Sequence, residues 1–354
     1  PSLETMAADV RSMPTPSRRP THVIHAATPV RGQSGTGDAE MLDICEAGTR
    51  RVLEVAAEAG VAGVLVAGTG AVYGPQPAGM ARIPESFMGS AEPASAYAEG
   101  KRRSEEIATA AARNGLPVCI ARCFAQAGPH LPLDCQFALG NFVADTLRGD
   151  PIIVRGDGTA VRTYLYATDL VEWILTLLVR GCRAGEPTCV NLGSEEPITI
   201  AELARLVAKT DRTLSGRADP LDVLLERRAV AGVGGNRYVP DCSRAEARFG
   251  LRASVPITDA VAPLGNAKCE PTRIRRRWAT RNGEHTGAVF IDDECSSLMS
   301  AAQTAACSTT APTPPTWNWR RFTRHWKTTC SRRARPTRRR RSEDTSICCL
   351  ALSL

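Results

Sequence analysis

The residues of this sequence best suited to chemistry are a tyrosine, a lysine and a threonine. Tyr97 and Lys101 stand four positions apart in the segment SAYAEGKRRSEE. On a helix this spacing places both side chains on one face, one turn apart, so that the ammonium favours the phenolate form of the tyrosine. A phenolate can remove a proton from a hydroxyl group. The same spacing also suits a solvated helix face, so the surrounding residues decide between the two interpretations.

The threonine, Thr69, follows the apolar run VAGVLVA and lies within AGTGAVYG. Ligands of α/β proteins bind at the carboxyl ends of parallel strands, which is where this position falls. We therefore expect the Thr69 hydroxyl to hydrogen-bond a substrate oxygen beside Tyr97. The alternative is a turn threonine between two glycines.

The elements that must position these residues alternate along the chain. Apolar runs predict strands at 21–27, 61–67 and 117–122, and helical spacing predicts helices at 38–59 and 96–114. Strands that alternate with helices at this spacing form a parallel sheet with right-handed crossovers. The fold class predicted is therefore α/β, with a doubly wound parallel sheet of the Rossmann type.

After residue 130 the pattern changes. A helix is expected at 137–148, a strand at 152–154, a helix at 170–179, and a strand, loop and helix within 189–208. Thr199 with Glu202 three positions later forms a capping-box signature at the start of the last helix. We predict an incomplete Rossmann domain at 1–130 and a smaller substrate lobe at 131–263, with some of the lobe's segments returning to the sheet.

The last segment, 264–354, differs in composition. It holds 17 Lys and Arg against 7 Asp and Glu, whereas residues 1–263 hold 27 against 30, so the excess behind the formal charge of +7 lies in this segment, which also contains PTPPT and TRRRR runs. Without a sustained helical or strand period, it is expected to be disordered or to result from a shifted reading frame. Arginines interleaved with aromatic residues in TWNWRRFTRHWK would suit stacking on bases. Nucleic acid is nevertheless not expected as a partner, because no nucleic-acid-binding fold accompanies them.

Composition excludes several further classes. No run of about 18 apolar residues and no signal-peptide layout is present, so a cytoplasmic protein without a membrane partner is expected. The 13 cysteines show no repeated CxxC spacing, so no metal site is predicted. Cys45, Cys119 and Cys123 lie in apolar stretches and are expected to be reduced thiols in the core.

Four segments in unbroken order resemble the extended short-chain dehydrogenase/reductase family of nucleotide-sugar epimerases, dehydratases and decarboxylases. They are HAAT at 25–28, GTGAVYG at 68–74, YAEGK at 97–101 and RCFAQAGPH at 122–130. The resemblance covers roughly residues 7–260. It implies tightly held NAD, a nucleotide-sugar substrate in the smaller lobe and a homodimer.

The resemblance also implies roles for individual residues. Thr69, Tyr97 and Lys101 match the catalytic trio, and Tyr97 and Lys101 also contact the cofactor. Further cofactor contacts are implied for Asp9 and Val10 beside adenine and for Ala26 and Ala27 beside the nicotinamide ribose. Substrate contacts are implied for Asn141 and Phe142 and for Arg162, which would bind the diphosphate. Tyr73 and Asp169 are expected to support the fold.

Three departures from the family pattern matter. No GxxGxxG phosphate loop is present, so the segment that carries it is expected to be missing before Pro1, with weak or no NAD binding as the result. Gly70 and Ala71 stand where dehydratases carry Asp and Glu and where decarboxylases commonly keep the Glu. Ala125 stands where many members have asparagine, which leaves the identity of the sugar open.

These residues favour an NAD-dependent 4-epimerase, or a related C4 oxidoreductase, that acts on a UDP- or dTDP-sugar through a 4-keto intermediate. One alternative is a 4,6-dehydratase or UDP-glucuronate decarboxylase that takes a carboxylate from elsewhere in the chain. Another is an inactive, truncated member of the family.

Overall fold

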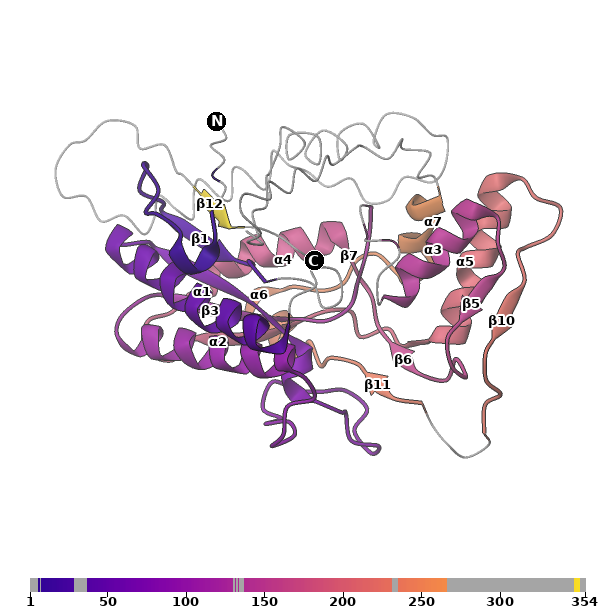
Figure 1. Ribbon diagram of the computed structural model, residues 1–354, viewed down its shortest axis with the longest axis horizontal. Helices are drawn as coiled ribbons and strands as arrows, with labels where there is room; N and C mark the ends of the chain where they lie inside the picture. Colours follow the sequence, from indigo (N-terminus) through magenta and orange to yellow (C-terminus); the bar gives the residue numbers. More distant parts are fainter. Residues whose placement is uncertain are drawn as a thin grey trace.

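The computed structural model describes residue 6 and residues 8–28, 37–129, 131, 133, 137–230, 235–265 and 347–350. The elements form two groups side by side, a parallel sheet with its helices and a smaller lobe (Figure 1). The expectation of disorder or a frame shift at 264–354 falls mainly on residues outside this set.

The main sheet has five strands in the order β12–β1–β2–β3–β8, and all neighbours are parallel. Its strands are β1 (His22–His25), β2 (Gly63–Thr69), β3 (Val118–Cys123), β8 (Thr188–Leu192) and β12 (Ile347–Leu350). The crossover order confirms the predicted Rossmann-type α/β fold. Strand β8 brings a segment beyond residue 130 back to this sheet.

Both faces of the sheet are buried, which explains why its strands are apolar without alternation. Helices α1 (Asp38–Ala59) and α2 (Ala96–Arg113) cover one face, where Val64 and Val66 join their core. Leu65, between these two valines, belongs to the core on the other face. Successive side chains of a strand point to opposite faces, so each strand supplies both cores.

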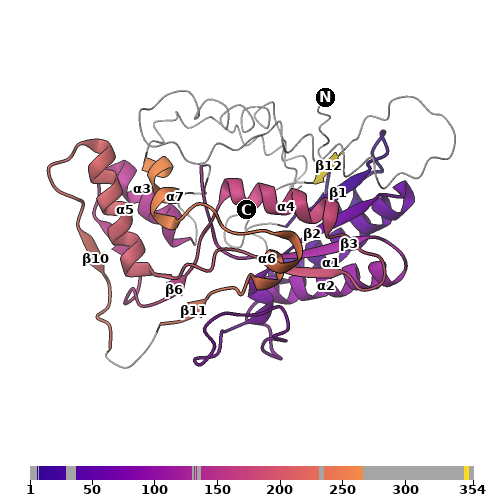
Figure 2. The ribbon, with the colours of Figure 1, turned by 180° about the vertical axis from the view of Figure 1, so that it is seen from behind.

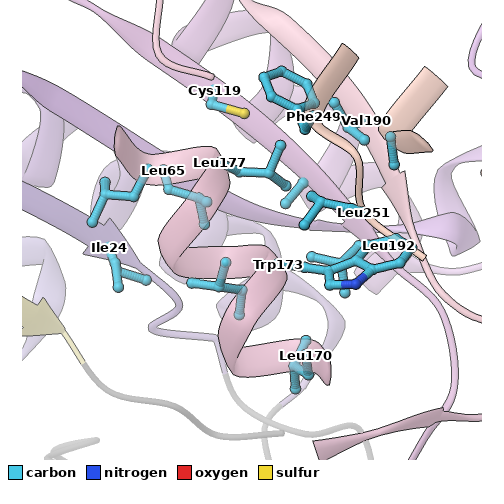
Figure 3. Packing of buried hydrophobic residues seen from close by; sticks show 14 of the residues in the cluster. Ile24, Leu65, Cys119, Leu170, Trp173, Leu177, Val190, Leu192, Phe249 and Leu251 are labelled. Carbon is cyan, nitrogen blue, oxygen red and sulfur yellow. The ribbon is translucent and has the colours of Figure 1, made fainter. Parts of the chain in front are cut away.

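The second face is covered by α4 (Ala167–Arg180) and α6 (Ser243–Phe249) (Figure 2). Trp173 and Leu177 of α4 lie against side chains of the strands, among them Leu65 and Leu192 (Figure 3). Each such buried side chain contributes about 1.5–3 kcal/mol relative to exposure. This packing holds the strands whose carboxyl ends carry the predicted site.

The smaller lobe packs α3 (Ala138–Arg148), α5 (Ile200–Ser215) and α7 (Ile257–Gly265) around one core. Three short sheets accompany these helices: β5 (Ile152–Val154) with β10 (Val223–Leu225), β6 (Val161–Arg162) between β9 (Ile198–Thr199) and β11 (Arg237–Tyr238), and β4 (Gln126–Ala127) with β7 (Leu165–Tyr166). The predicted capping box is confirmed, because Thr199 Oγ1 accepts from Glu202 N at 3.1 Å and the Glu202 carboxylate accepts from Thr199 N at 2.9 Å.

Several elements differ from the prediction. Strands β10 and β11 and helix α6 were not expected, since each is short and depends on partners remote in sequence. Helix α4 begins at Ala167 rather than 170. Strand β12 lies in the segment expected to lack regular structure; its backbone pairs in parallel with the edge of β1, where a strand's N–H and C=O groups are open to a further strand.

Candidate functional site

The predicted trio meets at the carboxyl end of β2. Lys101 Nζ donates to the carbonyl oxygen of Ala67 at 2.8 Å, two residues before Thr69. The same Nζ lies 6.0 Å from the centroid of the Tyr97 ring. The structure therefore places the lysine between the tyrosine and the strand end that carries the threonine.

Helix α2 fixes the tyrosine and the lysine relative to each other. It begins at Ala96, where Ser95 Oγ accepts from Ala98 N at 3.2 Å, so Tyr97 falls in the first turn and Lys101 one turn later. Lys101 is only 6% exposed. A buried ammonium has three protons that need acceptors, and the Ala67 carbonyl takes one of them. The remaining protons suit hydroxyl groups of a bound ligand.

Thr69 is the last residue of β2 and the N-cap of the short helix η2 (Gly70–Tyr73). Its Oγ1 accepts from Ala71 N at 3.2 Å. The side chain is only 8% exposed, so the turn residue is held at the site rather than in solvent. The cap bond fixes the hydroxyl at the strand end.

Tyr238, which the sequence did not single out, also reaches this site. Its hydroxyl oxygen lies beside Gly70, the residue after Thr69, where a Cβ built on the glycine would be 2.5 Å away, and its ring packs on Phe124 with centroids 4.5 Å apart. Burial raises the pKa of Tyr238 well above its ordinary value, so the phenol is protonated at neutral pH. The one signal available in sequence was an aromatic residue in NRYVP, beyond the lobe's last predicted helix.

The residues predicted to hold the cofactor lie around β1. Ala26 and Ala27 directly follow the strand, with Ala26 buried and Ala27 half-buried. The preceding His25 is buried, its Nε2 lies 3.0 Å from Thr49 Oγ1, and its Nδ1 has no hydrogen-bond partner. Small side chains beside an unsatisfied ring nitrogen and a buried ammonium fit the nicotinamide end of NAD.

The two residues predicted to lie beside adenine, Asp9 and Val10, are less accessible to a ligand. Asp9 caps η1 (Val10–Ser12), and its carboxylate accepts from Arg11 N at 2.8 Å and from the Arg11 guanidinium. These bonds to Arg11 lower the pKa of Asp9. Val10 is buried against α1, where a Cβ on Gly48 would lie 2.7 Å from Val10 Cγ1. Val10 therefore also contributes to the core, and Asp9 would meet a ligand while held by Arg11.

The predicted substrate residues lie in the smaller lobe. Arg162 is half-buried on β6, and its Nη1 donates to the carbonyls of Val161 at 2.8 Å and Asn236 at 3.0 Å. Asn141 is half-buried on α3, whereas the Phe142 side chain is 2% exposed within the lobe core. Only the backbone of Phe142 could face a ligand. A cavity of about 470 Å³ opens beside β6, lined in part by Gly158, Arg205 and Arg237.

Other kinds of site find no support among the described residues. They contain no group of three or more His, Cys, Asp or Glu that could hold a metal ion. None of their helices is long and apolar enough to cross a membrane. Cys45 and Cys119 are buried thiols, and burial raises their pKa, as expected for core residues without a role in chemistry.

Comparison with known families gives a match that covers more than half of the chain. A family model described as the NAD dependent epimerase/dehydratase family matches residues 5–193. This range includes the trio and most of the main sheet.

Curated relatives include UDP-glucuronic acid decarboxylases. Decarboxylase 3 from Arabidopsis thaliana is 32% identical over 169 residues, which are 45% of this chain and 46% of the relative. Decarboxylase 1 from the same plant is 33% identical over 224 residues, which are 59% of this chain and 47% of the relative. The chain spans about half the length of the curated relatives it matches.

Solved structures with the same fold include a UDP-glucose 4-epimerase from Thermotoga maritima with UDP-glucose. It has a TM-score of 0.60 and 22% identity, and the match covers 70% of this chain and 77% of the epimerase. MoeE5 in complex with UDP-glucose and NAD has a TM-score of 0.60 and 25% identity over 73% of this chain and 83% of MoeE5. The likeness extends beyond the family match into the smaller lobe.

Proposed function

Because the chain belongs to the NAD-dependent epimerase/dehydratase family, we propose that it oxidises and re-reduces C4 of a nucleotide sugar, as a 4-epimerase or a related C4 oxidoreductase. The observation that carries this proposal is the buried Lys101, bonded to Ala67 O at 2.8 Å and 6.0 Å from the Tyr97 ring, next to Thr69. Such a reaction needs a group that takes the proton of the C4 hydroxyl, and Tyr97 is the residue proposed for it.

Each residue of the trio has one task. Tyr97 removes the proton of the C4 hydroxyl and later returns it. Lys101 hydrogen-bonds ligand hydroxyls with its remaining protons. Thr69 hydrogen-bonds the C4 oxygen. The chemistry that NAD supplies when bound is acceptance and return of the hydride at C4.

The residues after Thr69 restrict the fate of the oxidised sugar. Gly70 and Ala71 have no group that could protonate a leaving hydroxyl, so elimination of water is not supported. Interconversion of the two C4 epimers needs no such group, since the 4-keto sugar only has to present its other face. This difference is why 4-epimerisation is the first candidate.

Decarboxylation of UDP-glucuronic acid is the second candidate, and the curated relatives favour it. Oxidation at C4 places a ketone β to the C6 carboxylate, and a β-keto acid loses carbon dioxide without a base at C5. The absence of a carboxylate at Gly70 and Ala71 therefore does not exclude this reaction.

The remaining contacts are proposed for the nucleotide end of a UDP- or dTDP-sugar. Arg162 offers a planar guanidinium to the diphosphate. Asn141 and the Phe142 backbone are proposed as further contacts to the nucleotide end of the substrate. Asp9, Val10, Ala26 and Ala27 are proposed for NAD, and the protein is proposed to be a cytoplasmic homodimer.

The test uses the full chain with NAD and either UDP-glucose or UDP-glucuronic acid carrying deuterium at C4. A C4 epimer of unchanged mass that keeps its deuterium supports epimerisation, and a product lighter by carbon dioxide supports decarboxylation. Loss of water would support a dehydratase and overturn the first candidate. Recovery of both substrates unchanged would favour the inactive member of the family.

A further inference from the structure

We propose that Arg102, on helix α2, is a positioning residue that holds Thr69 at a fixed distance from Tyr97. The inference rests on the proposed function, in which the threonine hydrogen-bonds the C4 oxygen and the tyrosine takes the proton of the C4 hydroxyl. The arginine acts through the main chain of the turn that Thr69 begins, not through a ligand. In the sequence it is only one of two neighbouring arginines in KRRSEE.

Two consecutive residues of α2 bind the main chain on either side of Thr69. Lys101 Nζ donates to the carbonyl oxygen of Ala67 at 2.8 Å, two residues before the threonine. Arg102 Nε donates to the carbonyl oxygen of Val72 at 2.9 Å, three residues after it. The threonine therefore lies between two main-chain segments that are each hydrogen-bonded to the helix of the predicted catalytic tyrosine.

The other two guanidinium nitrogens of Arg102 bind the segment that leads into α2. Nη2 donates to the carbonyl oxygen of Ser90 at 2.7 Å, and Nη1 donates to that of Ala91 at 3.3 Å. A guanidinium is planar and offers five N–H groups in a fixed arrangement, which suits acceptors that come from different segments. One side chain thus joins α2 to both ends of the loop 74–89, which connects the turn after Thr69 to the segment before the helix.

The main chain at these carbonyls is closely packed, so the guanidinium binds a well-defined structure. Ser90 N donates to Tyr73 O at 3.0 Å. Gly89 has a φ of +78°, which glycine adopts readily, and a Cβ on it would lie 2.7 Å from Tyr73 O. Val72 is buried. Removal of the Arg102 guanidinium would therefore take a donor from main-chain carbonyls that are partly shielded from water.

The consequence for the reaction is geometric. Thr69 Oγ1 accepts from Ala71 N at 3.2 Å, so the position of the hydroxyl follows that of η2. Tyr97 and Arg102 share α2, so the helix sets their relative positions. The bond from Arg102 to Val72 O then couples the threonine hydroxyl to the tyrosine. A displacement of about 1 Å in such a pair can lower a rate by about 10²-fold.

The first test compares kcat and KM of Arg102→Met with those of the wild-type protein, using the nucleotide sugar that the wild-type protein converts. Methionine keeps an unbranched apolar side chain and removes every N–H donor. We expect kcat to fall by roughly 10–100-fold with KM within about threefold, since the arginine binds main-chain carbonyls. The matched control is Arg103→Met, the next residue on the helix, whose side chain is 43% exposed and pairs with Glu99 and Glu46; its kcat should stay within about twofold. A kcat of Arg102→Met within twofold of wild type overturns the proposal.

Two further variants separate positioning from a general role in folding. Arg102→Lys keeps the charge but not the planar fork, so it should lose kcat in the same way, by a smaller factor. In a Thr69→Val background, Arg102→Met should lower kcat by less than about threefold, because the hydroxyl that it positions is already gone. A loss in that background as large as the loss in the wild-type background would overturn the proposal.

Hydrogen exchange of the full chain, followed by mass spectrometry, is independent of turnover. Arg102→Met should speed exchange in peptides that cover 70–74 and 89–91 by roughly fivefold, the effect of one hydrogen bond, whereas Arg103→Met should not. Peptides from α5 should exchange as in the wild-type protein, which excludes global unfolding as the cause. Unchanged exchange at 70–74 would overturn the inference even in an active enzyme. Faster exchange there in a chain without turnover would support the hold of the arginine on the turn and refute the proposed function instead.

Discussion

The most instructive perturbation lies directly beneath the trio, at Tyr73 in the turn that Thr69 begins. Its hydroxyl donates to Asn191 Oδ1 at 2.7 Å and accepts from Arg122 Nη1 at 2.9 Å. Arg122 is itself held by the Glu105 carboxylate at 2.6 Å, and all four side chains are largely buried. Burial raises the pKa of Tyr73, so the phenol remains neutral. The network therefore ties η2 to β3, β8 and α2.

The variant Tyr73→Phe keeps the ring and deletes the oxygen at the centre of this network. It leaves the Asn191 amide oxygen without its donor and takes one acceptor from the Arg122 guanidinium. An unsatisfied buried group costs about 1–3 kcal/mol, more where a charge is involved, so we expect a loss of roughly 2–3 kcal/mol. For a folded region of this size, that corresponds to a fall in Tm of roughly 5–10 °C.

The measurement is urea and thermal unfolding of Tyr73→Phe beside the control Tyr166→Phe. The control removes an oxygen from a half-buried tyrosine outside this network. It should change the free energy of unfolding by less than about 1 kcal/mol. Equal losses in the two variants would refute the reasoning, because they would show that the hydrogen bonds of Tyr73 contribute no more than an ordinary hydroxyl.

Three further perturbations test other parts of the site. Burial, and after it the charge of Lys101, lowers the pKa of His25 to about 3. Below about pH 6.5 the unfolded chain therefore binds a proton at this residue that the folded chain does not, so the free energy of unfolding decreases as the pH falls. His25→Gln should reduce this decrease between pH 7 and 4.5 by roughly 2–3 kcal/mol. If the urea-derived free energies of the two proteins change in parallel with pH, this prediction is contradicted. Arg162→Lys should weaken binding of UDP-glucose, measured by calorimetry, by roughly tenfold without a change in Tm, and equal affinity would remove Arg162 from the site. Gly70→Ala should lower the free energy of unfolding by roughly 1–3 kcal/mol, because its Cβ would overpack the neighbouring side chains. The control Gly79→Ala, whose Cβ meets nothing within 4 Å, should lower it little. Equal effects of the two variants in thermal unfolding would show that the space beside Thr69 is not filled.

The fold, and the positions of Tyr97, Lys101 and Thr69 within it, could be predicted from sequence because their signals are local. Apolar strands buried on both faces and helices with their own caps are visible within short windows, as at Thr199 and Glu202. Tyr97 and Lys101 share a helix, and Thr69 immediately follows a strand. The roles expected for Tyr73 and Asp169 agree with their contacts, since the Asp169 carboxylate accepts from Ser254 N at 2.8 Å and from Ser254 Oγ at 2.6 Å.

The remaining features depend on contacts between distant segments. Tyr238 reaches the turn after Thr69 because two-residue strands pair and because Gly70 leaves space, and neither condition leaves a periodic signal in the sequence. The sequence also gives no periodic signal for the hydrogen bonds of Arg11 to the Asp9 carboxylate or for the core position of the Phe142 side chain. Sequence identifies which residue types are present at the site, but packing decides which of their atoms remain open to a ligand.

The central claim is that Tyr97, beside the buried Lys101, transfers the proton of the C4 hydroxyl. The most direct measurement is the turnover number of Tyr97→Phe in the full chain with NAD and the converted nucleotide sugar, together with the affinity for that sugar. Loss of a general base lowers rates by about 10²–10⁴-fold, so kcat should fall by that amount while the affinity stays within about twofold. A variant that retains most of its turnover would contradict the account.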